Sequence, residues 1–372
     1  MLLSDEDNLR LNILLSQDLK AVRIDESKMI VYALSAKGDA TIQLNPSCKD
    51  EKYIKLVKEL LSQKIMGSPG GYPVYIKRWT RMGQERREES LAQLLLLGEE
   101  EAVIAVVHAP QLSAEIARNA WWAFPSAANA RQLLEKKEVA VSSLARELVE
   151  FLLEFLPFEE EHKDMIDSVR LCLQPGLLTA AEIEELWKRA KRKQSLYVGF
   201  LHSLPDGLPE QGKAHSLYAH IEARQIEQNQ CENIYLNQLK RYLSEPGQVF
   251  LNTVLRVIEK AASQDTIVSM FHAFCSYNQH LPLAQHKQRS IDEAFILADD
   301  WIADSTNAQL YECVQGFPEY QSQIRAMLVI AQLGEVTLFP IFGLTDALGT
   351  VMRKKLKPLT DPLQLQIKAL TE

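Results

Sequence analysis

The sequence has few cysteines, and no two of them form a paired motif. The five thiols are Cys48, Cys172, Cys231, Cys275 and Cys313, an odd number without CxxC spacing. Disulfide frameworks and structural zinc sites need paired cysteines, so this pattern favours free thiols in a reducing compartment. The segment MLLSDEDNLRLN carries acids where a signal peptide carries a basic region. We therefore expect a cytoplasmic protein.

Basic residues are outnumbered by acidic ones. The 372 residues include 41 Lys and Arg against 49 Asp and Glu, which gives a formal net charge of −8. Sequence-independent binding of nucleic acid needs a basic field, so this balance argues against a general nucleic-acid coat. A local basic patch remains compatible with it.

Uncharged apolar runs are too short to cross a bilayer. The most apolar stretch extends from Ala326 to Lys357, and Glu335, Pro340 and Asp346 interrupt it. A transmembrane helix needs about 20 consecutive apolar residues. We expect two buried helices here and no membrane span.

Motifs with a chemical mechanism are also missing. There is no GxSxG nucleophile elbow, and GSPGG at residues 67–71 has neither P-loop nor GxGxxG spacing, so we interpret it as a tight glycine turn. Loose groups of candidate metal ligands occur at His272, Cys275, His280 and His286, and at His215, His220 and Glu222. Neither group matches a zinc signature. We expect no metal and no cofactor, and a protein that is not an enzyme.

The first 84 residues have the pattern of a small α+β domain. Short β-branched runs at 21–25, 29–35 and 40–44 are separated by turn residues, which predicts a meander of strands. From Tyr53 to Leu61 the apolar residues follow a helical stripe, with Asp50 as the expected cap. The segment GYPVYIKRW predicts a further strand.

After Glu85 the sequence predicts helices throughout. Short apolar patterns of helical period are separated by prolines, and Thr179 with Glu182 forms a capping box at the start of one of them. These irregular helix pairs resemble an α-solenoid of the HEAT type. LPDGLPEQGK, residues 204–213, is the best candidate boundary. We predict three domains: a small α+β domain at 1–84, a helical-repeat-like domain at 85–205 and a C-terminal helical domain at 206–372.

Two segments could bind a partner. One, residues 67–87, mixes aromatic and basic side chains as single-strand binders do. Its candidate side chains for an anion or RNA are Lys77, Arg78, Trp79, Arg81, Arg86 and Arg87, and the alternative is a solvated surface paired with neighbouring glutamates. The other is RNAWWAF, in which Trp121 and Trp122 could anchor a protein, with core packing as the alternative.

Several segments together resemble the DsrS family of soluble proteins, whose genes accompany the reverse-operating dissimilatory sulfite reductase of sulfur-oxidising bacteria. They are DNLRLN, AVRIDESKM, GSPGGYPVY, RWTRMGQ, ARNAWWAFPSAANAR, EFLPFEEE and SVRLCLQPGL, within the first 205 residues. The resemblance implies a cytoplasmic accessory protein of sulfur oxidation, and it carries no catalytic residues across.

The leading hypothesis is therefore a non-enzymatic accessory or regulatory protein that binds another macromolecule, a protein first of all, through a helical scaffold. The alternatives are an enzyme or binding protein for an anionic small molecule, or an RNA-binding regulator, acting through residues 67–87.

Overall fold

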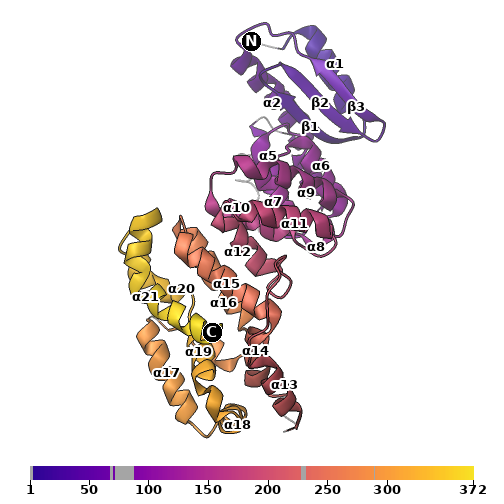
Figure 1. Cartoon of the computed structure of the whole chain (residues 1–372). Coiled ribbons are helices and arrows are strands. Elements are labelled where there is room, and N and C mark those ends of the chain that lie inside the picture. Colours follow the sequence, from indigo (N-terminus) through magenta and orange to yellow (C-terminus); the bar gives the residue numbers. More distant parts are fainter. Residues whose placement is uncertain (1–2, 68–69, 72–87, 228–231, 289) are drawn as a thin grey trace. The chain divides into compact units, whose positions relative to one another are not determined.

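The computed structural model describes residues 3–67, 70–71, 88–227, 232–288 and 290–372 (Figure 1). The protein is mainly helical, with a small antiparallel sheet near the N-terminus, as the sequence predicts. The chain forms two compact units, Met1–Phe155 (unit 1) and Leu156–Glu372 (unit 2). The boundary between these units lies at neither of the positions that the sequence suggested, and the three-domain division stays a prediction.

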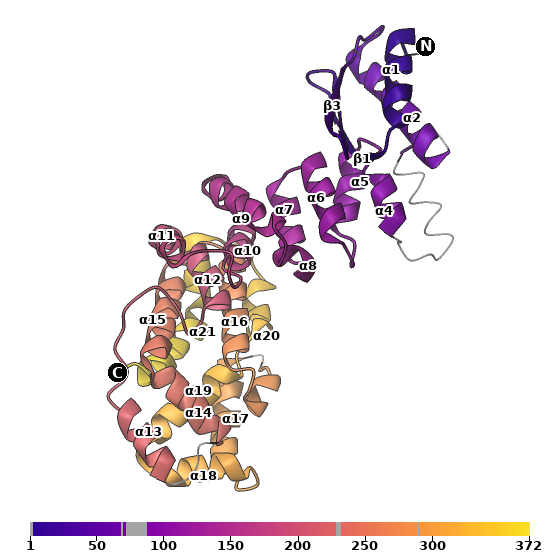
Figure 2. The ribbon, with the colours of Figure 1, turned by 90° about the vertical axis from the view of Figure 1, so that its right-hand side faces the viewer.

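Unit 1 begins with a helix that the sequence patterns did not reveal, followed by the expected meander. The elements are α1 (Asp5–Leu15), β1 (Leu19–Asp25), β2 (Ile30–Ser35), β3 (Gly38–Gln43) and α2 (Asp50–Met66). The sheet order is β1-β2-β3, with both pairs antiparallel, and Arg23 lies opposite Tyr32 while Tyr32 lies opposite Thr41. In Figure 2, α1 and α2 lie together on one side of this sheet.

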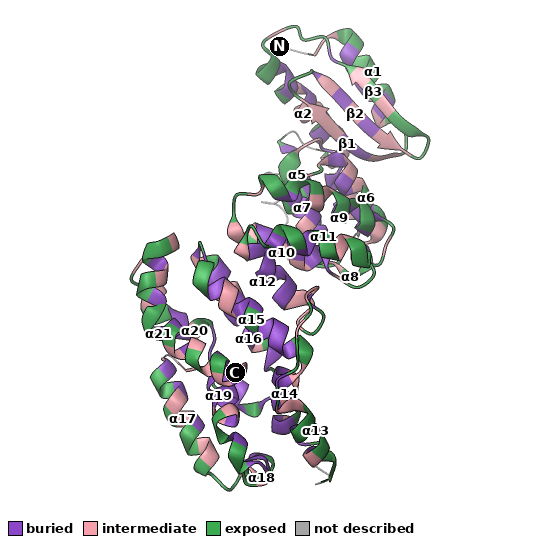
Figure 3. Cartoon of the chain, in the orientation of Figure 1, coloured by how far each residue is buried: buried purple, intermediate pink, exposed green. Residues whose placement is uncertain are grey.

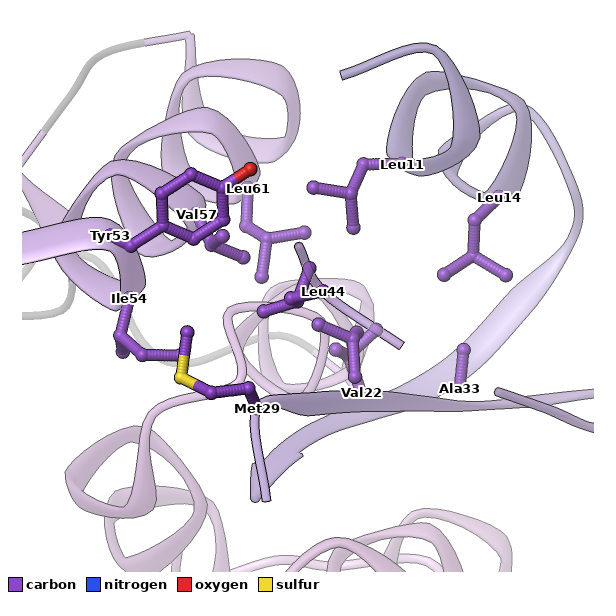
Figure 4. Close-up of a cluster of buried hydrophobic side chains, with 11 residues drawn as sticks. Leu11, Leu14, Val22, Met29, Ala33, Leu44, Tyr53, Ile54, Val57 and Leu61 are labelled. Atoms are coloured by element: carbon purple, nitrogen blue, oxygen red, sulfur yellow. The ribbon is translucent and has the colours of Figure 1, made fainter. Parts of the chain in front are cut away.

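The core of this part lies between the sheet and the two helices. Figure 4 shows Val22 and Ala33 from the strands facing Leu11 and Leu14 from α1 and residues of α2. The predicted helical stripe supplies Tyr53, Ile54, Val57 and Leu61 to this cluster. The predicted cap was wrong: Lys49 is the N-cap of α2 and makes no side-chain cap bond, while Asp50 is the first helical residue. Asp50 still favours the helix start through its negative charge.

Gly67 ends α2 in the left-handed conformation, with φ of 69°. This geometry suits glycine and agrees with a turn after Ile65. The predicted strand GYPVYIKRW lies outside the described residues.

The rest of unit 1 is helical. Its helices are α4 (Glu88–Leu94), α5 (Glu100–Val107), α6 (Ala114–Ala123), α7 (Ala127–Leu134), α8 (Lys137–Ala140) and α9 (Leu144–Phe155). Helix α6 packs against β1. An ion pair of 2.7 Å between Lys20 Nζ and Glu115 Oε1 joins the strand to the helix.

Unit 2 is helical throughout the residues described. It contains η1 (Leu156–Phe158), α10 (His162–Cys172), α11 (Ala180–Ala190), α12 (Gln194–Ser203), α13 (Tyr218–Glu227), α14 (Ile234–Leu243), α15 (Glu245–Lys260), α16 (Gln264–Tyr277), η2 (Pro282–Gln285), α17 (Ile291–Ala303), α18 (Ala308–Gly316), η3 (Pro318–Tyr320), α19 (Gln321–Ala331), α20 (Glu335–Phe342) and α21 (Gly349–Ala369). The predicted capping box of Thr179 and Glu182 opens α11.

The solenoid prediction is not confirmed. In a solenoid each repeat contacts only its neighbours. Here the C-terminal helix α21 packs against α15, α17 and α19, and α12 packs against α10, α11, α15 and α16. Figure 3 shows α12 almost wholly buried, which fits a central helix of a bundle.

The proposed boundary segment 204–213 is tied to unit 2. Asp206 accepts two hydrogen bonds from Arg241, at 2.9 and 2.6 Å, and Glu210 accepts two from Arg256, at 2.7 and 2.5 Å. Proline, glycine and charge suggested a linker, but the charged residues bind this segment to α14 and α15.

Candidate binding surfaces

The structure tests only part of the predicted site. The candidate anion-binding or RNA-binding residues Lys77, Arg78, Trp79, Arg81, Arg86 and Arg87 all lie outside the described residues. The two tryptophans are both on α6, where adjacent residues of a helix point in different directions. Their surroundings differ accordingly.

Trp121 belongs to the core of unit 1. Its side chain is 6% exposed, its Nε1–H donates to Glu147 Oε1 at 2.8 Å, and its ring meets Phe151 edge-on with centroids 4.9 Å apart. A buried indole with its donor satisfied is a packing residue. The prediction that Trp121 anchors a partner does not fit this burial.

Trp122 is half-buried and reaches the surface beside the sheet. Its Nε1–H donates to Asp39 Oδ2 at 3.3 Å. The Arg23 guanidinium lies 5.1 Å from the Trp122 ring centroid and 4.7 Å from that of Tyr32. We call Arg23, Tyr32 and Trp122 the aromatic cluster. A cation held between two rings is a preorganised contact.

The strand pairing places this cluster. Arg23 and Tyr32 are opposite each other in the antiparallel pair, so their side chains share one face of the sheet. This face is opposite to the one carrying Val22 and Ala33, and α6 brings Trp122 to it. Strand alternation could have identified Arg23 and Tyr32 as neighbours, but nothing local in the sequence indicated that residue 122 joins them.

An open cavity of about 620 Å³ borders the cluster. It is lined by Val22, Arg23, Ile24, Asp25, Glu26, Ser27, Lys28, Tyr32, Gly98, Glu99, Glu100, Val103, Ala123, Phe124 and Pro125. Hydrogen bonds from Ser27 and Lys28 lower the pKa of Asp25 to about 2. Asp25 is therefore ionised near neutral pH and cannot act as a general acid. Among the described residues, no histidine or cysteine lines the cavity.

A second cavity, of about 540 Å³, lies in unit 2 where α11 ends and α12 begins. Its lining residues are Leu156, Pro157, Glu185, Lys188, Arg189, Arg192, Lys193 and Leu196. Four cations thus surround an apolar floor, and all four are exposed. The signal in the sequence is the run KRAKRK, residues 188–193.

Several of the residues named as candidate metal ligands instead form ordinary hydrogen bonds with other groups. His272 Nε2 lies 3.1 Å from Glu335 Oε2, Cys275 Sγ lies 3.5 Å from the Leu333 carbonyl, and His220 bonds to the Tyr320 hydroxyl. Among the described residues, no group of three or more His, Cys, Asp or Glu side chains could hold a metal ion.

The buried cysteines are not poised for nucleophilic chemistry. Burial raises the pKa of the Cys172 thiol to about 12, and it does the same for Cys313. A thiol with so high a pKa holds almost no thiolate near neutral pH. Cys172 is thus a packed thiol.

No single described helix is long and apolar enough to span a membrane. One pair, Pro318–Ala331 with Glu335–Phe342, meets the length and composition criteria together, but it is bent by 67°. Comparisons with protein-family models, with curated proteins and with solved structures found no match.

Proposed function

We propose that the protein is a non-enzymatic accessory or regulatory protein that binds another protein, and that its partner contacts the aromatic cluster of unit 1. The resemblance to the DsrS family extends this proposal to a cytoplasmic role in bacterial sulfur oxidation. The observation that carries the binding role is the half-buried Trp122–Arg23–Tyr32 stack beside an open cavity.

The composition of the cluster supports this role. Tryptophan, tyrosine and arginine are the residues most enriched among interface side chains that dominate binding energy. Here the bond from Trp122 to Asp39 and the Arg23 guanidinium against both rings hold the cluster before any partner arrives. A preorganised surface loses little side-chain entropy on association.

The charged residues that line the cavity are mainly acidic. Four of its lining residues are acidic, at Asp25, Glu26, Glu99 and Glu100, and two are basic, at Arg23 and Lys28. Glu26 is already paired with Lys58 at 2.7 Å, and Asp25 with Lys28 at 3.2 Å. A partner that inserts an amide or basic side chain beside an apolar group matches this surface.

The experiment is affinity capture from sulfur-grown cells with the full chain, followed by mass spectrometry. We expect one specific protein to be retained by the wild type and lost by at least about tenfold with Trp122→Ala, because such anchors contribute about 2 kcal/mol or more. Tyr311→Ala is the matched control, since Tyr311 is an exposed aromatic residue of unit 2. Equal retention by both variants and the wild type would refute the role of the cluster.

A second candidate is binding of an anionic small molecule, which the basic cavity of unit 2 favours. Guanidinium and ammonium groups pair with phosphate or sulfur oxyanions, and Leu156, Pro157 and Leu196 can accept an apolar part of the ligand. Calorimetric titration with ATP and with thiosulfate tests it. The variant Lys188→Gln/Arg192→Gln should lose any binding, whereas Lys52→Gln/Lys55→Gln, an equal charge change on α2, should keep it.

The remaining alternative is an RNA ligand held by residues 67–87. It is tested by replacing Arg78, Arg81 and Arg86 together with Gln, which should weaken RNA binding and flatten its salt dependence.

A further inference from the structure

Unit 2 exposes a group of large apolar side chains where α20 passes into α21. Phe339 is 57% exposed, Leu344 85%, Leu348 65% and Val351 57%. We call these four residues the apolar elbow. Single exposed apolar residues are ordinary on a soluble surface, but four within thirteen positions are characteristic of an interaction site.

The sequence-based expectation of two buried helices is right for α19 and wrong for the elbow. From Ala326 to Ala331 every residue of α19 is 1% exposed or less. The apolar run continues through Phe342, yet the chain turns outward there and the elbow side chains face water.

The backbone of the elbow is fixed to unit 2. Gln264 Nε2 donates to the Thr345 carbonyl at 2.7 Å, and the Gly349 N–H donates to the Ala262 carbonyl at 2.8 Å. Arg353 donates to the Ala261 carbonyl at 2.7 Å. Because these bonds hold the turn from behind, Leu344 and Leu348 project outward on an ordered backbone.

Cations follow the elbow within one helical turn. In α21 the exposed residues Val351, Lys354, Lys355 and Pro358 have the spacing i, i+3, i+4, i+7, while Met352, Leu356 and Leu359 face the core. One helical turn rises about 5.4 Å, so Lys354 and Lys355 lie about one turn along α21 from Val351. From Phe339 to Lys357 the sequence has four bases and a single acid, Asp346.

Two of these four cations are bonded within unit 2, and two are available to a ligand. Lys355 Nζ donates to Thr345 Oγ1 at 2.6 Å, and Arg353 bonds to a carbonyl and to Thr350. Within the described part of the chain, Lys354 and Lys357 form no ion pair. They carry positive charge next to an apolar surface in a protein whose net charge is −8.

We propose that the apolar elbow and the cations of α21 bind the surface of an anionic lipid bilayer. Phe339, Leu344, Leu348 and Val351 enter the boundary between headgroups and acyl chains, and Lys354, Lys355 and Lys357 pair with lipid phosphates. Interfacial segments combine these two features, with an apolar part about 5–10 Å deep and basic residues at headgroup level. The binding is peripheral, because no described helix can span the bilayer alone.

A fluid bilayer fits this surface better than an acidic protein does. The elbow side chains are more than half exposed, and Leu344 is 85% exposed, so they protrude from the surface. A protein partner would need a matching rigid pocket for each of them, whereas acyl chains close around protruding side chains of any arrangement. This membrane role is independent of the aromatic cluster in unit 1.

The test is flotation of the full chain with vesicles of phosphatidylcholine alone and of phosphatidylcholine with 30% phosphatidylglycerol. We expect binding to the anionic vesicles and a loss of at least about tenfold with Leu344→Ser/Leu348→Ser. Lys354→Gln/Lys357→Gln should lower binding about tenfold, and salt should weaken the wild type.

Matched controls are Ile226→Ser/Leu365→Ser, which removes two similarly exposed apolar residues of unit 2, and Lys52→Gln/Lys55→Gln on α2. Both should bind as the wild type does, and unchanged melting curves should show that every variant folds. No binding to anionic vesicles, equal binding to neutral ones, or equal losses in the controls would overturn the proposal. Binding of soluble polyglutamate without binding of vesicles would also overturn it, in favour of an acidic protein partner.

Discussion

The two units bury polar side chains in different ways. Unit 1 buries a carboxylate: Asp7 is 0% exposed, and its Oδ2 accepts the Tyr53 hydroxyl at 2.6 Å and the Asn45 N–H at 2.8 Å. The other oxygen, Oδ1, has no partner among the described residues. The stability of this core therefore depends on two donors to a single carboxyl oxygen.

Around Asn278, unit 2 buries a network of neutral groups that satisfy one another. Asn278 Oδ1 accepts the Tyr242 hydroxyl at 2.9 Å and the Gln238 amide at 3.3 Å, while Asn278 Nδ2 donates to the Phe274 carbonyl at 3.0 Å. The positive charge nearby, Arg241, is paired with Asp206 at the surface. A neutral network avoids the desolvation penalty of a buried charge, so it can hold several helices with modest individual bonds.

The surfaces of the two units differ as well. In unit 1 the half-buried indole of Trp122 contacts Arg23 and Asp39 of the sheet. In unit 2 the backbone of the apolar elbow is hydrogen-bonded to neighbouring residues, whereas its apolar side chains are exposed. An aromatic ring that is held in one orientation suits a specific protein partner. Exposed aliphatic side chains suit a fluid lipid bilayer, which can adapt to them.

The largest loss of stability is expected from a substitution that breaks the Asn278 network of unit 2. Asn278→Ala leaves the Tyr242 hydroxyl without its acceptor, and a buried orphan costs about 1–3 kcal/mol. It also removes one of the two acceptors of the Gln238 amide and the bond to the Phe274 carbonyl. We expect the free energy of unfolding of unit 2 to fall by about 2–5 kcal/mol, measured by urea denaturation. Asn252→Ala, an exposed asparagine of α15, should change it by less than about 0.5 kcal/mol. Similar values for both would contradict the role of the network.

A smaller effect is expected in unit 1. Tyr53→Phe removes one of the two donors to Asp7 Oδ2 and should destabilise the unit by about 1–3 kcal/mol, since the buried carboxyl group then keeps only the Asn45 N–H as a donor. Urea denaturation followed by circular dichroism measures it, with Tyr311→Phe as the exposed control. A loss of unfolding free energy larger than that of Asn278→Ala would contradict the expectation that the Asn278 network contributes more than the bond to Asp7.

The smallest expected effect is a difference between the two units in how their stability depends on pH. Burial lowers the pKa of His202 below its usual value near 6.5, so the unfolded chain binds this proton more readily than the folded one. Stability should therefore be full above about pH 6.5 and should fall as the pH drops below it, by at most about 1.4 kcal/mol per pH unit for each such group.

His202→Gln should flatten this pH dependence without abolishing it, because burial lowers the pKa of His215 too. His108→Gln in unit 1 should leave the slope unchanged, since His108 is exposed and is the single histidine before residue 156. The readout is the urea midpoint between pH 5 and 8. A slope that responds equally to both substitutions would show that His202 is not its source.

Much of the fold could be predicted because it depends on local patterns. The strands β1 to β3, the stripe of α2 and the capping box of α11 all follow from spacing within a few residues. The sequence analysis does not predict helix α1: its acidic residues argue against a signal peptide, but they also suit the first turn of a helix. The segment at 204–213 was interpreted as a linker because composition does not reveal which arginines its acids will meet.

The candidate sites could be predicted only in part. Trp122 was named from the sequence, but its partners Arg23, Tyr32 and Asp39 are 83 or more residues away along the chain. The basic run 188–193 is visible in the sequence, whereas the apolar floor beneath it includes Leu156 and Pro157 from an earlier segment.

The sequence by itself determined the helical class, the early meander and the lack of a recognisable catalytic motif, because these depend on residue type and on short-range period. Only the tertiary structure decided which apolar faces are covered. Trp121 and Trp122 are adjacent, yet one is buried and the other meets solvent; α19 and the apolar elbow belong to one apolar run, yet only α19 is enclosed. Burial depends on the elements that pack against a residue, and those elements come from distant parts of the chain.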